Sequence, residues 1–101
     1  MREDFNAKLW VNGTEIQMNQ FVEAFICGTI VGGISTLKGV GDIQSLDVYQ
    51  ERDEVSVNVN NQDLALTPFP KELISGTLLG LVSPLKNVER VEKVHVIVNK
   101  M

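Results

Sequence analysis

The sequence predicts an α+β domain in which a six-stranded, mainly antiparallel sheet carries two helices on one face. Three observations support this fold class. The chain aligns with itself without gaps after a shift of 48 residues, each half contains segments of alternating apolar and polar residues, and an apolar segment with helical spacing follows two such segments in each half. We therefore expect a single domain over 1–101, built from two ββαβ units over about 5–50 and about 53–99 that are related by pseudo-twofold symmetry.

The internal repeat consists mostly of apolar and small residues. Between 11 and 49, about a dozen of the 39 aligned pairs are identical, whereas roughly two or three identities are expected by chance. The identical residues include Val11-Asn12 with Val59-Asn60 and Gly28-Thr29 with Gly76-Thr77. Because one unit alone is near the lower size limit for an independent core, the two units are expected to share one.

The first unit begins with a predicted β-hairpin. Residues 5–11 alternate, Asn12-Gly13 is typical of a type I′ turn, and 14–18 alternate again. The side chain of Asn19 suits a helix N-cap, and a third strand is expected over about 44–49.

The second unit has the same signals in the same order. Alternating residues over 55–59 and 63–66 flank Asn60-Asn61, and asparagine tolerates the positive φ of a hairpin turn. Thr67-Pro68 predicts a helix start with proline at the first helical position, and a last strand is expected over about 92–98.

Each helix is expected to end at a short terminal turn. Pro84 cannot continue a regular helix, so the second helix should break near Ser83. Gly39 and Asn87, which are 48 positions apart, suit a left-handed C-terminal cap. The linker over 50–53 is as short as a hairpin turn and favours pairing of the third strand with the fourth.

The alternation also separates the two faces of the sheet. The residues expected to face the helices are Leu9, Val11, Ile16, Met18, Leu46, Val48, Val57, Val59, Leu64, Leu66, Val94 and Val96. Two strand orders fit the connections. In the swapped order, 2-1-6-3-4-5, the last strand of each unit pairs with the hairpin of the other unit. The unswapped order, 2-1-3-6-4-5, makes the linker cross a strand, so we favour the swapped one.

Composition argues against several classes of function. A net charge of −4, an isoelectric point near 4.8 and scattered basic residues argue against nucleic acid and anionic membranes as partners. The apolar segment over 21–37 is too short for a membrane span and carries Glu23. The single cysteine, Cys27, excludes an internal disulfide framework, and the charged segment over 1–4 is unlike a secretory signal, so we expect a cytoplasmic protein.

Small residues form the most specific local pattern. They occur at positions i, i+4 and i+7 of each expected helix, as Gly28, Gly32 and Ser35 in the first and Gly76, Gly80 and Ser83 in the second. Glycine inside a helix costs about 1 kcal/mol relative to alanine, so this pattern implies close approach by another group. Either the two helices pack small side to small side on the pseudo-twofold axis, which we favour, or they line a cleft where a ligand contacts the backbone.

Three large residues lie on the face of the sheet that is expected to be exposed. Trp10, Tyr49 and Ile97 share the parity of the polar face, and the residue 48 positions after Trp10 is Asn58. An exposed tryptophan that departs from the repeat is a candidate site for a protein partner. The alternative is that Trp10 lies flat on the surface or under a terminus.

Titratable residues give weaker signals. The candidates for binding a cation such as Ca²⁺, around the turn between the units, are Asp47, Glu51, Asp53 and Glu54. A solvated acidic loop is the favoured alternative. His95 lies 48 positions after Asp47, and in the swapped order these two side chains could meet as an ion pair. Cys27 lies in an apolar helix and is expected to be a buried, inert thiol.

Several of these motifs resemble those of small archaeal proteins of unknown function that consist of a single ββαβ unit. The motifs are Val11-Asn12-Gly13, Phe21-Val22 after the N-cap, and the pattern S-x-L-K-G-V over 35–40. The likeness covers 9–48 and, more weakly, 57–98, where Asn61 and Asn87 replace two glycines. The resemblance implies a fold and the pairing of units, and it implies no activity.

Together these observations predict a binding or structural module that is not an enzyme and needs no cofactor. It is expected to associate with itself or with a protein partner, through the sheet face around Trp10 or through an edge strand. The alternative is a protein that binds a small ligand or a divalent cation, either in the cleft between the small-residue stripes or at the acidic turn. An enzyme of this size would normally show two or more convergent titratable groups, and the expected helices offer almost none.

Overall fold

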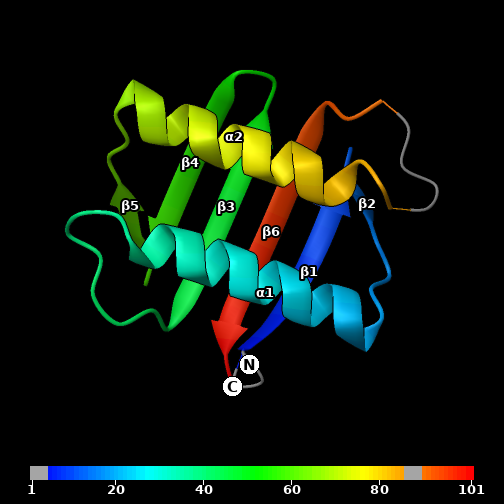
Figure 1. The fold of residues 1–101 in the computed structure, drawn as a ribbon, viewed down its shortest axis with the longest axis horizontal. Helices are drawn as coiled ribbons and strands as arrows, with labels where there is room; N and C mark the ends of the chain where they lie inside the picture. The colour runs from blue at the N-terminus through cyan, green and yellow to red at the C-terminus, as the bar shows by residue number, and fades with distance from the viewer. Residues whose placement is uncertain (1–4, 86–89) are drawn as a thin grey trace.

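The computed structural model describes residues 5–85 and 90–101. In chain order the elements are β1 (Phe5–Val11), β2 (Thr14–Glu15), α1 (Gln20–Ser35), β3 (Ser45–Glu51), β4 (Glu54–Val59), β5 (Gln62–Leu64), α2 (Pro68–Val82) and β6 (Lys93–Lys100). Figure 1 shows one twisted sheet with α1 and α2 running in opposite directions across the same face. The predicted α+β class, with two helices covering one face of six strands, is confirmed.

The strand order is β2-β1-β6-β3-β4-β5, and every pairing is antiparallel. This order confirms the swapped arrangement, because β6 pairs with β1 and β3 at the centre of the sheet. Val48 of β3 lies opposite Val96 of β6. Of the two central strands, β3 comes from the middle of the chain and β6 from its end, so the complete sheet cannot form before the chain is nearly complete.

The core lies between the sheet and the helices. Its buried apolar residues are Ala7, Leu9, Val11, Ile26, Cys27, Ile30, Val31, Ile34, Ile43, Leu46, Val48, Val55, Val57, Leu78, Val82, Val94, Val96 and Val98. The helix-facing parity predicted for the strands is confirmed. The positions near the hairpin ends, Ile16, Met18, Val59, Leu64 and Leu66, pack against this core but are only partly buried.

The two helix starts differ in their caps. The Asn19 side chain accepts a hydrogen bond from the backbone N–H of Val22 at 2.8 Å, as a helix N-cap does. Thr67 holds the same position in α2 but makes no side-chain cap hydrogen bond. The residue that corresponds to Val22 is Pro70, which has no N–H to donate.

Strand lengths depart from the predictions. The strands expected over 14–18 and 63–66 are shorter, at Thr14–Glu15 and Gln62–Leu64, because the chain must leave the sheet early to reach the helix layer. Conversely, β3 extends to Glu51, so the expected linker over 50–53 is reduced to a turn in which Arg52 adopts a φ of 56°.

The helix ends follow the proline and glycine signals. Helix α2 stops at Val82, and a turn at Ser83-Pro84 follows it, as expected. Gly39 has a φ of 88°, in the left-handed region that favours glycine. The corresponding cap expected at Asn87 lies outside the described residues. Among the described helices, none has both the length and the apolar character that crossing a membrane requires.

The first hairpin turn is held by one asparagine. Asn12 has a φ of 52°, and its Oδ1 accepts hydrogen bonds from the backbone N–H groups of Glu92 (2.7 Å) and Lys93 (2.9 Å). Its Nδ2 donates to the carbonyl of Arg90 at 2.6 Å. The turn between β1 and β2 is thereby fastened to the start of β6.

Asn60 holds the second hairpin turn with the same set of bonds. Its φ is 54°, its Oδ1 accepts from the N–H groups of Gln44 (2.7 Å) and Ser45 (3.0 Å), and its Nδ2 donates to the carbonyl of Asp42 at 2.8 Å. Each of these partners lies 48 positions before the corresponding partner of Asn12.

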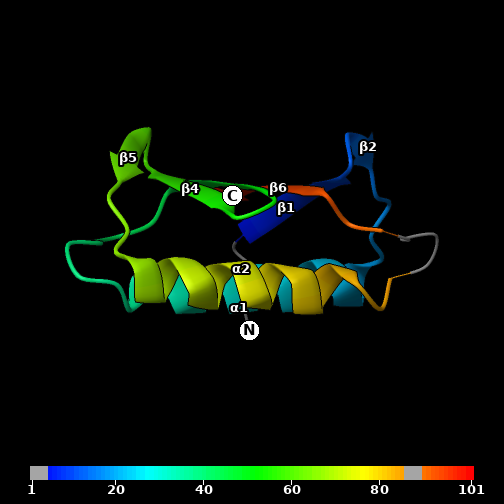
Figure 2. The same cartoon turned by 90° about the horizontal axis from the view of Figure 1, so that it is seen from above.

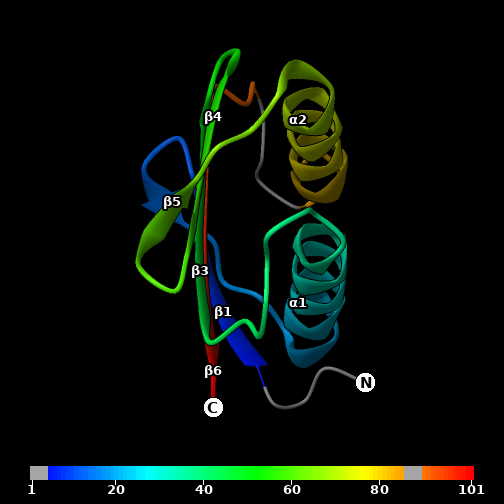
Figure 3. The same ribbon diagram turned by 90° about the vertical axis from the view of Figure 1, so that its left-hand side faces the viewer.

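Both hairpins lean to the same side of the sheet. Figure 2 shows β2 and β5 at opposite ends of the molecule, raised away from the helices, and Figure 3 shows the same from the side. The molecule therefore has two broad faces of different character: a helix layer, and an open sheet face flanked by two hairpins.

Candidate functional site

The outward side of the helix layer carries large apolar side chains. The residues at i, i+4, i+7 and i+11 of each helix form what we call the helix outer face: Phe21, Phe25, Gly28 and Gly32 in α1, and Phe69, Leu73, Gly76 and Gly80 in α2. The exposed fractions are 72% for Phe21, 54% for Phe25, 67% for Phe69 and 56% for Leu73. Apolar exposure on this scale is typical of a contact surface.

Three of the four glycines of this face are not used for close packing within the chain. A Cβ added at Gly32, Gly76 or Gly80 would have no neighbour within 4 Å. The favoured expectation that the helices pack small side to small side is therefore wrong at these three positions. Both helices direct most of their large aliphatic residues to the sheet, so the small residues at the opposite side point away from it and do not meet each other.

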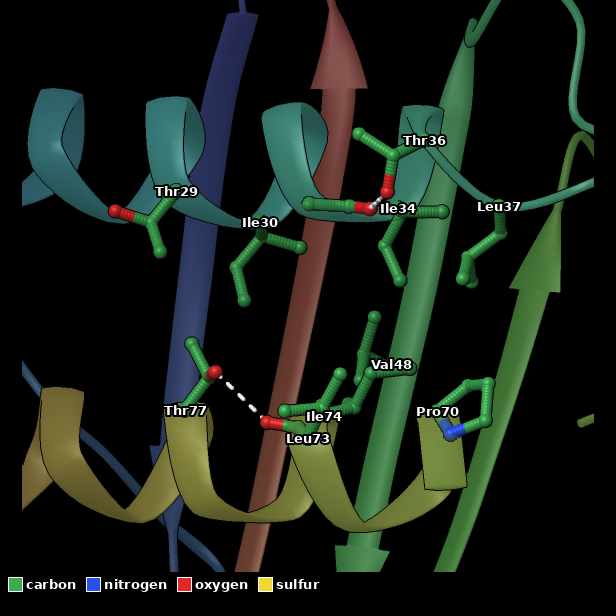
Figure 4. A pocket seen from close by; sticks show the side chains of 11 residues that line it. Thr29, Ile30, Ile34, Thr36, Leu37, Val48, Pro70, Leu73, Ile74 and Thr77 are labelled. Atoms are coloured by element: carbon green, nitrogen blue, oxygen red, sulfur yellow. Dashed lines mark hydrogen bonds between the residues drawn. The ribbon is translucent and has the colours of Figure 1, made fainter. Parts of the chain in front are cut away.

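An apolar cavity of about 250 Å³ lies between α1 and α2. Its walls come from the second half of α1, the first half of α2 and the β3 floor: Thr29, Ile30, Gly33, Ile34, Thr36, Leu37, Val48, Pro70, Leu73, Ile74 and Thr77. Figure 4 shows Ile30 and Ile34 directed from α1 towards Ile74 of α2 across this space. None of the predicted stripe residues Gly28, Gly32, Ser35, Gly76, Gly80 and Ser83 lines it. Gly33, which sequence reasoning did not select, does.

The open sheet face carries an aromatic cluster at its centre. His95 of β6 lies between Trp10 of β1 and Tyr49 of β3, with ring centroids 5.4 Å and 5.5 Å away. A hollow of about 260 Å³ beside these rings is also lined by Gly13 and Lys93. Trp10 and Tyr49, selected from the sequence, are thus brought together around one histidine, and both are partly buried.

Ile97, the third residue selected on this face, is also partly buried. It lies in the next row of the sheet, between Lys8 of β1 and Asp47 of β3. It therefore continues the aromatic cluster along β6 rather than lying apart from it.

Of the four acidic candidates, Asp47 and Glu51 have separate partners, and Asp53 and Glu54 are exposed. Asp47 Oδ1 lies 2.7 Å from Nε2 of His95, so the contact anticipated from the sequence is present. Glu51 accepts a hydrogen bond from the Tyr49 hydroxyl at 2.9 Å, which raises the pKa of that tyrosine. Within 5–85 and 90–101, no group of three or more His, Cys, Asp or Glu side chains is placed to hold a metal ion.

Cys27 is a free thiol in the core. Burial, with a smaller contribution from the negative charge of Glu23, raises the pKa of Cys27 to about 11. The neutral thiol is a poor nucleophile. This agrees with the expectation of an inert cysteine.

Sequence reasoning missed the helix outer face as a surface. The signal was present, because the two phenylalanines of α1 share one helical row with Gly28 and Gly32, and a row that mixes bulky and absent side chains packs poorly on a flat sheet. We had instead placed the contact surface on the sheet.

Comparison with known proteins gives no match: no family model, curated protein or solved structure is significantly similar to this chain.

Proposed function

We propose that this protein is a self-associating module, not an enzyme, and that two copies pair through the helix outer face. The observation that carries the proposal is the exposure of Phe21, Phe25, Phe69 and Leu73 on one side of the molecule. Removing such side chains from water contributes roughly 25 cal/mol per Å² of apolar surface. A surface of this kind is stable in water when another apolar surface covers it.

The shape of the face favours a second copy as the partner. Each helix is bulky in its first half, at Phe21 and Phe25 in α1, and flat in its second half, at Gly28 and Gly32. When the same helix from a second copy lies antiparallel to it, bulky halves meet flat halves. Such self-complementarity is the requirement for a twofold-symmetric interface.

The charge distribution supports the same partner. The chain carries a net charge of −4, so two copies repel each other where their charged surfaces meet. The helix outer face contains no charged residue. Glu23, the one charged residue of α1, is turned towards the sheet and accepts a hydrogen bond from the backbone N–H of Ala7 at 2.9 Å. The eight residues of this face can therefore meet those of a second copy without placing like charges opposite each other, whereas the exposed Glu72 of α2 lies outside this face.

The broad side of the molecule is large enough for a standard interface if most of it takes part. The whole molecule measures 36 × 30 Å in the view of Figure 1, on the order of 1,000 Å², and a standard interface uses about 800 Å² of each partner. The edge strands β2 and β5, with two and three residues, offer far less. The helix layer is therefore a better candidate for the dimer interface than a sheet edge.

Within this proposal the chain itself is a tandem pair of ββαβ units that complete one core. The hydrogen bonds of Asn12 and Asn60, which recur at a spacing of 48 residues, support this view. So do equivalent strand registers, since Val11 pairs with Val94 as Val59 pairs with Leu46. We further propose a cytoplasmic location and a protein rather than a nucleic-acid partner, in keeping with the free thiol and the negative charge.

The test combines native mass spectrometry with sedimentation velocity over a wide range of protein concentration. We expect a dimer, and we expect Phe25→Asp to give a folded monomer, because a carboxylate on an apolar interface must be desolvated. Trp10→Ala is the matched control on the opposite face and should leave the dimer intact. Circular dichroism establishes that both variants are folded.

Two results would contradict the proposal. A wild-type monomer at all concentrations would remove it. A dimer that survives Phe25→Asp but dissociates in Trp10→Ala would move the contact to the aromatic cluster of the sheet, where the sequence alone had placed it.

A further inference from the structure

The cavity between the helices suits an apolar occupant. Two of the three threonine hydroxyls that line it are already used, since Thr36 donates to the carbonyl of Gly33 and Thr77 to the carbonyl of Leu73, both at 2.7 Å. Leu73 belongs both to the cavity wall and to the helix outer face, so the two are continuous. An apolar cavity of about 150 Å³ accepts benzene. A volume of about 250 Å³ therefore has room for a phenyl ring.

Gly33 is one reason why the cavity exists. A Cβ at this position would meet nothing within 4 Å, and the residue 48 positions later, in α2, is Leu81. The wall of α1 thus lacks a side chain that the corresponding position of α2 supplies. Glycine here also weakens the helix by about 1 kcal/mol relative to alanine, and nothing within 4 Å of this position uses the space.

On the basis of the self-association proposed above, we propose that the ring of Phe25 from a second copy inserts into this cavity. The two α1 helices then lie antiparallel across a twofold axis. Phe25 and Gly33 are eight residues apart, or roughly 12 Å along the helix, and the midpoint between them is Thr29. The axis passes beside Thr29, and both cavities of the dimer are filled in the same way.

The glycines of α1 fit this geometry. Gly28 and Gly32 lie on the outer face on either side of the proposed axis, where two helix backbones must come closest. A Cβ at Gly32 would point into open space in the single chain, and that space is what the second helix takes up. The small-residue stripe of α1 therefore packs between copies.

Phe25 is favoured over the other exposed aromatics. Phe69 is next to Pro70, at the rim of the cavity in its own chain. Phe21 packs on Phe25 with ring centroids 6.0 Å apart, so it covers the inserted ring from outside.

The first experiment locates the axis by cross-linking. Thr29→Cys in a Cys27→Ser background should form a disulfide-linked dimer under mild oxidation, because a disulfide requires Cα atoms within about 7 Å of each other. A chain with one cysteine can form only an intermolecular bond. The matched control is Thr77→Cys in the same background, which places the thiol at the corresponding position of α2 and should stay unlinked.

The second experiment is a double-mutant cycle on the dimer dissociation constant. Gly33→Leu fills the cavity from its own chain, and Phe25→Ala removes the inserted ring. Each should weaken the dimer at least about tenfold, and the double variant should be little weaker than either single variant, because both remove the same contact. Thermal unfolding of each variant shows that the fold is retained.

The outcomes separate this inference from the proposed function. A dimer that cross-links at Thr77→Cys and not at Thr29→Cys, or whose dissociation constant Gly33→Leu changes less than about twofold, overturns the insertion of Phe25 and leaves self-association standing. A monomer that carries a defined extra mass in native mass spectrometry overturns both, because a small molecule then fills the cavity. A wild-type monomer without added mass also removes both.

Discussion

Asp47 and His95 are 48 positions apart in the chain, and their side chains meet on the open sheet face with 2.7 Å between Oδ1 and Nε2. The contact runs diagonally between neighbouring strands, because the direct neighbour of His95 on β3 is Tyr49. It exists only because β6 lies between β1 and β3. The same strand order places Trp10 on the other side of His95. The position of β6 between β1 and β3 thus brings the side chains of this cluster together.

The Asp47–His95 contact should contribute little to stability. Its side chains are 49% and 33% exposed, and exposed pairs contribute about 0–1 kcal/mol. We expect Asp47→Asn to change the free energy of unfolding by less than about 1 kcal/mol in urea denaturation. A loss of several kcal/mol would mean that the cluster is a structural centre of the sheet.

The two turn asparagines should be equally important. Asn12→Ala and Asn60→Ala each remove three hydrogen bonds and place alanine at a positive φ, so we expect each to lower the free energy of unfolding by about 2–4 kcal/mol. Asn61→Gly is the control, because glycine adopts the φ of 68° found there without strain. Clearly unequal losses would show that only one turn anchors the sheet.

Glu23 should stabilise the edge of β1. Strand β2 pairs only with Trp10 and Val11, so the backbone N–H of Ala7 lies beyond it and is satisfied by the Glu23 carboxylate. Glu23→Ala leaves this partly buried donor without its acceptor, and we expect a loss of about 1–3 kcal/mol by chemical denaturation. Glu23→Gln keeps an acceptor and should lose less. If exposed Glu72→Ala were equally costly, the bond to Ala7 would not be the cause.

Cys27 should make stability fall at alkaline pH. Its pKa is raised by burial from 9.0 to about 11, so the thiolate favours the unfolded chain. The contribution of the thiol is fully present below pH 9 and is lost as the pH rises through 11. Thermal unfolding between these pH values should therefore show a decline that is smaller in Cys27→Ser, and iodoacetamide should react at neutral pH only as fast as the protein opens. Rapid alkylation of the native protein would contradict this.

Replacing an outer glycine should stabilise the single chain even where the proposed dimer needs the space. Gly80→Ala adds a methyl group into open space and improves helix propensity, so the free energy of unfolding should rise by about 0.5–1 kcal/mol. Gly13→Ala, at a φ of 85°, is the contrasting control and should destabilise. A destabilising Gly80→Ala would indicate that the space around it is occupied in the assembled protein.

The sequence predicted the elements well where their causes are local. Alternation with a period of two residues marked the strands, Asn19 marked a helix start, and Pro84 marked a helix end. Thr67-Pro68 also marked a helix start correctly, although the Thr67 side chain makes no cap hydrogen bond. The sequence placed the ends of β2 and β5 too far along the chain, because strand ends depend on where the helix layer lies.

The sequence by itself determined the order of elements and the face of the sheet that is buried, and it favoured the swapped strand order, since short connections and residue periodicity act within a few positions of the chain. Only the tertiary structure decided between the two strand orders and showed which sides of the helices remain exposed. Most of the large aliphatic residues of both helices pack on the sheet, and this leaves Gly32, Gly76 and Gly80 facing open space and Gly33 beside a cavity. The exposed surface of a helix depends on its distance from the neighbouring helix, and packing of side chains across the whole sheet sets that distance.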